Sequence, residues 1–74
     1  MERYKNLSGQ SGVAAYEIVS DSITVQFKDG KFYRYTNASA GSQNVEHMKS
    51  FAIAGQGLNS FINTTVRKNY DSKW

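Results

Sequence analysis

The strict alternation of apolar and polar residues at positions 23–27 (Ile-Thr-Val-Gln-Phe) is the strongest structural signal in this sequence. A period of two is typical of a strand with one buried face. Asp29-Gly30 follows, and residues 31–36 are again rich in aromatic and β-branched side chains, so the two segments predict a β-hairpin. Residues 13–19 are also β-prone and are followed by turn formers at 20–22, which predicts a three-stranded antiparallel meander.

Two hairpin registers are compatible with these residues, and they bury different aromatic side chains. A two-residue turn at Asp29-Gly30 would put Tyr33 and Tyr35 on the face opposite the alternating apolar residues. A three-residue loop over residues 28–30, with its glycine at positive φ, pairs Val25 with Tyr33 instead. We favour the second register because it gathers five large side chains on one face: Ile23, Val25, Phe27, Tyr33 and Tyr35.

Two amphipathic helices are expected after the hairpin. Residues 37–41 predict a linker into Ser42, whose hydroxyl suits the N-cap of a helix through residue 54, with Val45, Met48, Phe51 and Ala52 on its apolar side. Gly55-Gln56-Gly57 should end this helix. A second helix over residues 58–68 is indicated by helical spacing of Leu58, Phe61, Ile62, Thr65 and Val66. Two helices on one face of the meander make a two-layer α+β domain.

The chain is too short for a second core. It has 74 residues and no cysteine, so one core must form without a disulfide or a thiolate zinc site. Residues 1–10 are mostly polar, and we expect them to be a flexible leader, with residues 11–74 forming the single domain. The charged first residues and the lack of a long apolar stretch predict a cytoplasmic protein without a membrane segment.

A modest positive charge permits contact with nucleic acid. The formal net charge is +3, a surplus that the needs of solubility alone also explain. In the favoured register Phe32 and Arg34 point outward near Lys28 and Lys31, which combines phosphate attraction with an aromatic face for stacking. A solvated sheet face with one exposed aromatic residue explains the same pattern.

A second basic stretch lies at residues 67–74, where Arg67 and Lys68 precede further cations and two aromatic residues. We expect Tyr70 to close the core and Trp74 to mark a loose chain end.

Catalytic and metal-binding patterns are weak. His47 is the single histidine and has only Glu46 beside it as a further ligand, so a helix-surface position is expected and no metal or cofactor is predicted. The serines lie in turns and linkers without a nucleophile-elbow motif. Gly55-Gln56-Gly57 lacks the Gly-Lys-Ser of phosphate loops and is interpreted as an interhelical turn.

An ordered set of residues resembles the KTSC domain, a family named after the C-terminal region of some lysyl-tRNA synthetases. The set covers residues 11–70 and consists of Phe27, Gly30, Tyr33-Arg34-Tyr35, Asn63, Val66 and Tyr70. The resemblance implies a small domain for which RNA binding has been suggested, with Tyr33, Tyr35, Asn63 and Tyr70 as motif residues for the core or a ligand. The sequence departs from the family pattern at Gly55-Gln56-Gly57-Leu58 and lacks a proline before the first helix.

These observations favour a non-enzymatic domain that binds RNA or single-stranded nucleic acid. The candidate contact residues are Lys28, Lys31, Phe32, Arg34, Arg67 and Lys68. The alternative is a protein-interaction or self-associating module, a monomer or weak homodimer, because a three-stranded sheet exposes strand edges.

Overall fold

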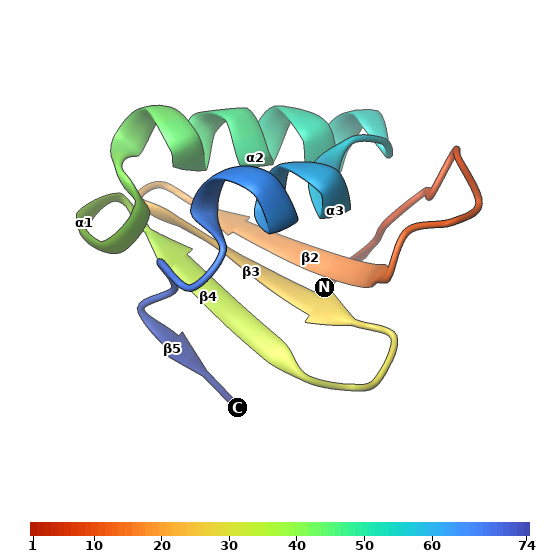
Figure 1. Ribbon diagram of the computed structural model, residues 1–74, viewed down its shortest axis with the longest axis horizontal. Helices are drawn as coiled ribbons and strands as arrows, with labels where there is room; N and C mark the ends of the chain where they lie inside the picture. The colour runs from red at the N-terminus through yellow and green to blue at the C-terminus, as the bar shows by residue number, and fades with distance from the viewer.

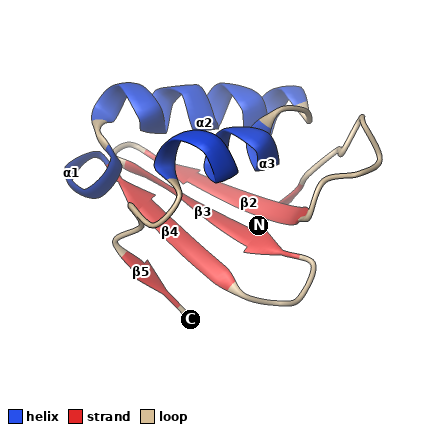
Figure 2. Cartoon of the chain, in the orientation of Figure 1, coloured by secondary structure: helices blue, strands red, loops and turns tan.

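One antiparallel sheet with helices over one of its faces makes up the fold (Figure 1). The computed structural model describes residues 1–74. The elements follow one another as β1 (Glu2–Arg3), β2 (Val13–Val19), β3 (Ser22–Phe27), β4 (Phe32–Thr36), α1 (Asn37–Ala40), α2 (Ser42–Ala54), α3 (Leu58–Phe61), the π-helical segment η1 (Ile62–Val66) and β5 (Ser72–Lys73). The strand order in the sheet is the order in the chain, β1 to β5. Figure 2 shows the helices and the sheet as two layers, which confirms the predicted α+β class.

The central hairpin adopts the favoured register. Val25 pairs with Tyr33 and Ile23 with Tyr35, so the loop contains the three residues 28–30. Gly30 has a φ of 91°, and its N–H donates to the Phe27 carbonyl at 2.9 Å. The alternating apolar residues therefore lie on the same face as the two tyrosines, and Tyr35 is buried in the core.

The first ten residues take part in the fold, so the prediction of a leader outside the core is wrong. β1 pairs with β2 through Arg3 and Ala15, and the side chain of Tyr4 is only 3% exposed. The Tyr4 hydroxyl accepts a hydrogen bond from the Leu58 backbone N–H at 3.4 Å. The polar composition of the segment did not predict its place in the fold, because a single large aromatic side chain, Tyr4, anchors it.

The last residues form a fifth strand, so the prediction that Trp74 marks a loose end is also wrong. Ser72 and Lys73 pair with β4. Phe32 and Trp74 exchange two backbone hydrogen bonds, at 2.8 and 3.0 Å. The sheet thus has five strands where three were predicted, because each edge of the meander pairs with a two-residue strand.

The first long helix ends at the predicted residue but has a different N-cap. Gly41 is the N-cap of α2 and no side chain caps the helix, so the proposed role of Ser42 is wrong. Most of the predicted linker is instead the short helix α1, which begins with a capping box between Thr36 and Ser39. Gly55 ends α2 with a left-handed φ of 80°, as expected for the interhelical turn.

The second helix is shorter and less regular than predicted. α3 changes after Phe61 into η1, whose last hydrogen bond joins the Arg67 N–H to the Ile62 carbonyl at 2.7 Å. The helix therefore ends at Val66 rather than at Lys68. No helix in the fold combines the length and the apolar character needed to cross a membrane.

The core lies between the sheet and the helices. Its buried side chains come from both layers and from the N-terminal segment: Tyr4, Val13, Ile23, Val25, Tyr35, Ala40, Val45, Met48, Ala52, Leu58, Ile62 and Val66. The spacing of Val45, Met48 and Ala52 on α2, and of Leu58, Ile62 and Val66 on α3 and η1, places one stripe of each helix on the sheet.

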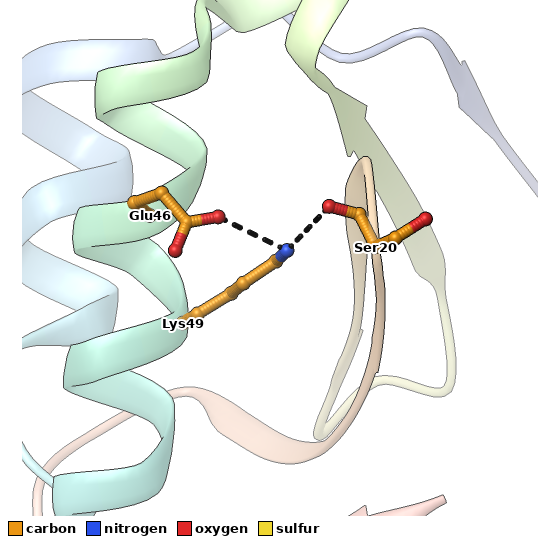
Figure 3. Close-up of polar contacts among 3 residues, drawn as sticks. All are labelled: Ser20, Glu46 and Lys49. Carbon is orange, nitrogen blue, oxygen red and sulfur yellow. Dashed lines mark hydrogen bonds and ion pairs between the residues drawn. The ribbon is translucent and has the colours of Figure 1, made fainter.

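A polar contact between Lys49 on α2 and Ser20, in the turn between β2 and β3, joins the two layers (Figure 3). The ammonium group of Lys49 donates to the Ser20 carbonyl oxygen at 3.0 Å and to Glu46 Oε2 at 3.2 Å. This Lys49–Glu46 contact is the only ion pair in the fold. Every other lysine and arginine is free of an acidic partner.

Candidate nucleic-acid interface

A cavity of about 630 Å³ opens between the sheet and the chain that follows η1. Its walls come from the β3–β4 hairpin, η1 and its continuation, and β5, and the lining residues are Gly12, Phe27, Lys28, Asp29, Tyr33, Tyr35, Ile62, Asn63, Arg67, Lys68, Tyr70 and Lys73. The volume lies within the range of small-molecule sites in proteins. Segments that are distant in sequence thus converge on one hollow.

The positive charge of the chain is concentrated at this cavity. Four of the nine lysines and arginines line it, with only one of the six acidic residues. The remaining five cations and five acidic residues cancel, so the surplus of +3 equals the charge of the lining. Solubility alone does not require such a concentration, whereas attraction of an anion does.

The cavity cations are available to a ligand. None of Lys28, Arg67, Lys68 and Lys73 has a carboxylate within ion-pair distance, because the single ion pair lies on α2. Lys73 contacts an aromatic face instead, with its ammonium 5.6 Å from the centre of the Tyr70 ring. The Asp29 carboxylate accepts the backbone N–H of Lys31 at 3.0 Å and thereby stabilises its own loop.

Aromatic rings form the inner wall of the cavity. The Tyr33 and Tyr70 ring centres are 5.2 Å apart, and Tyr33 packs edge-on against Phe27 at 5.3 Å. Tyr35 lies behind them and is 1% exposed. Burial, and secondarily the neighbouring Tyr33 and Tyr70, raise the pKa of Tyr35 to about 12. The Tyr35 hydroxyl therefore stays protonated and donates to the Arg67 carbonyl oxygen at 3.4 Å.

The backbone at Arg67 is strained. Its φ of 40° and ψ of −107° are rare for a residue with a side chain, and the strain follows directly after η1. Such conformations cost on the order of 1–3 kcal/mol and gather at binding sites, as do π-helical turns. Here the turn ends the helix and brings Arg67 and Lys68 to the cavity.

Phe32 and Arg34 lie on the opposite face of the sheet, where they form a separate surface with Trp74. Phe32 stacks on Trp74 with ring centres 5.5 Å apart and planes 11° from parallel. The Arg34 guanidinium lies 5.3 Å from the centre of the Trp74 ring. We call Phe32, Arg34 and Trp74 the outer stack. Lys31 lies at the border of the two surfaces, in a hollow of about 200 Å³ that is also lined by Tyr33, Lys73 and Trp74.

The structure therefore divides the predicted site. It brings Lys28, Arg67 and Lys68 together with the four motif residues Tyr33, Tyr35, Asn63 and Tyr70, which all line the cavity. Lys31, Phe32 and Arg34 lie elsewhere. Sequence reasoning missed Lys73 and Trp74 as partners of these two surfaces. The sequence feature that could have indicated both residues is the interleaving of cations and aromatic residues at positions 67–74. Trp74 was interpreted there as the mark of a loose end.

The remaining chemistry-bearing residues are dispersed. His47 is exposed on α2, where its ring packs edge-on against Phe61 with centres 6.0 Å apart. No group of three or more histidine or acidic side chains that could hold a metal ion forms in the fold. Comparisons with family models, with curated proteins and with solved structures gave no match.

Proposed function

We propose that this chain is a non-enzymatic domain that binds RNA or single-stranded nucleic acid. The observation that supports it best is the cavity, where four unpaired cations and three tyrosines surround one hollow and account for the whole positive surplus of the chain. Phosphate attraction and aromatic contact are the two components of single-strand binding.

The outer stack extends the proposed surface. Lys73 lines both the cavity and the smaller hollow beside Trp74, so β5 joins the two surfaces. A strand lying across β5 reaches the cavity cations on one side and Lys31 on the other. Arg34 and the exposed side of Trp74 then offer a platform for a base.

The proposal also fits what the resemblance to the KTSC domain implies, since RNA binding is the role suggested for that family. The alternative, protein interaction through exposed strand edges, has less support. The outermost strands β1 and β5 have two residues each, and such short edge strands offer little backbone for pairing with another chain.

The test is a fluorescence-anisotropy titration of labelled single-stranded RNA and DNA of about 10 nucleotides, at about 50 mM and about 200 mM salt. We expect binding that weakens steeply with salt. In the double variant Lys28→Glu/Lys68→Glu the affinity should fall at least about tenfold, because two phosphate contacts become repulsive.

The control is Arg3→Glu with Lys5→Glu, which makes the same change in net charge in the N-terminal segment, away from the cavity-lining residues. It should retain most of the affinity. Absence of binding at low salt, or equal losses in the two double variants, would contradict the proposal.

A further inference from the structure

The cations that line the cavity come from three different segments of the chain. Lys28 comes from the β3–β4 loop, Arg67 and Lys68 from the chain after η1, and Lys73 from β5. The internal phosphodiesters of a strand carry one charge each and are spaced along a path, so a row of cations along a groove matches them. Cations on several sides of one hollow match a compact group with more than one charge.

Hydroxyl donors are available at the same place. Tyr35 is the only cavity tyrosine whose hydroxyl makes a hydrogen bond within the fold. The hydroxyls of Tyr33 and Tyr70 have no partner, although their rings are fixed by edge-on packing at 5.2 Å. A phosphomonoester offers three strong acceptor oxygens and close to two negative charges at neutral pH. Cations together with neutral hydroxyl donors therefore match both the charge and the acceptor oxygens of a phosphomonoester.

The size of the cavity supports one nucleotide as the occupant. About 630 Å³ is room for a small ligand. The tyrosine rings and Phe27 present aromatic surface to a base. The only acidic residue of the lining, Asp29, has its carboxylate engaged by the Lys31 N–H, which reduces its repulsion of an anion.

We infer that the cavity binds a single nucleotide through a terminal phosphomonoester, either free or at the end of a strand. This inference rests on the proposed function and narrows it, because it names the end of the strand as the part that enters the cavity. The internal nucleotides of the bound nucleic acid then lie over the outer stack.

The experiment is isothermal titration calorimetry of the full chain at one salt concentration. The ligands are a short oligouridylate with a 5′-phosphate, the same with a 3′-phosphate, the same with hydroxyl ends, and the small molecules UMP, uridine and inorganic phosphate. We expect at least one phosphorylated oligonucleotide to bind about tenfold or more tightly than the hydroxyl form. UMP should bind more tightly than uridine and than inorganic phosphate.

Hydroxyl removal tests the donors without changing charge. Tyr33→Phe and Tyr70→Phe keep the packed rings and should lower the affinity for the phosphorylated end several-fold, with little effect on the hydroxyl-ended strand. Tyr16→Phe, a half-buried tyrosine on β2 outside the cavity, is the matched control and should change neither.

The outcomes separate the two proposals. Equal, salt-sensitive binding of all three oligonucleotides would overturn the inference and leave nucleic-acid binding standing. Binding of UMP without any oligonucleotide would support the nucleotide site and overturn strand binding. Inorganic phosphate as tight as UMP would overturn the nucleotide assignment, and no binding of any ligand would overturn both.

Discussion

Tyr35 is the residue that links the core to the candidate site. Its ring belongs to the buried core, while its hydroxyl donates to the carbonyl oxygen of the strained Arg67. A hydrogen bond of this kind contributes about 1 kcal/mol, and here it holds the turn that carries two of the cavity cations. The motif tyrosine is therefore a positioning residue as well as a core residue.

The pKa of Tyr35 predicts a loss of stability in alkali. Because its pKa rises from 10.0 to about 12 on folding, the protonated phenol is favoured by the folded state. This contribution to the free energy of unfolding is fully present below about pH 10 and is lost as the pH rises through about 12. Urea unfolding measured from pH 8 to 12 should show the decline, and Tyr35→Phe should show a flatter profile. Identical profiles would contradict the assignment.

At the scale of elements, the short segments at the two ends complete the sheet. β1 and β5 contain two residues each, but each is anchored by an aromatic side chain next to it, Tyr4 in the core and Trp74 on Phe32. Neither strand has a periodic pattern, so pattern analysis of the sequence assigned both to loose ends. The anchoring side chains show why both segments nevertheless join the sheet.

The N-terminal segment is expected to contribute strongly to stability. Tyr4→Ala removes a side chain that is 3% exposed and leaves a cavity, which should lower the free energy of unfolding by about 3–5 kcal/mol. Leu7→Ala, at a side chain that is 64% exposed in the same segment, should change it by no more than about 0.5 kcal/mol. Chemical denaturation monitored by circular dichroism measures both. Similar small changes in the free energy of unfolding for the two variants would show that the N-terminal segment does not contribute to the core.

At the scale of the whole molecule, one core and one sheet predict a single cooperative transition. Trp74 is the only tryptophan, and it lies next to β5, at the opposite edge of the sheet from β1. Its fluorescence and the far-ultraviolet circular dichroism should therefore report the same urea midpoint. An earlier fluorescence transition would show that β5 detaches before the core unfolds, and that the outer stack is not an integral part of the domain.

The fold was predictable where local chemistry was decisive. Of the two hairpin registers compatible with the sequence, the one favoured for the position of Gly30 and the alternation around it is the one found, and the end of α2 is at Gly55 as predicted. The end of the second helix was not predictable, because no glycine or proline follows Val66 to mark a stop. The π-helical turn and the strained Arg67 arise where the chain turns back toward β4 and β5.

For the site, the kinds of residue are evident from the sequence: a small surplus of cations, a tyrosine pair on a strand and a basic, aromatic end. Which of these residues lie together depends on the fold. Lys28 is far from Lys68 and Lys73 along the chain and shares a cavity with them because the hairpin, η1 and β5 close around it. Arg34, between two cavity tyrosines in sequence, lies on the other face, because neighbouring residues of a strand point to opposite sides of the sheet.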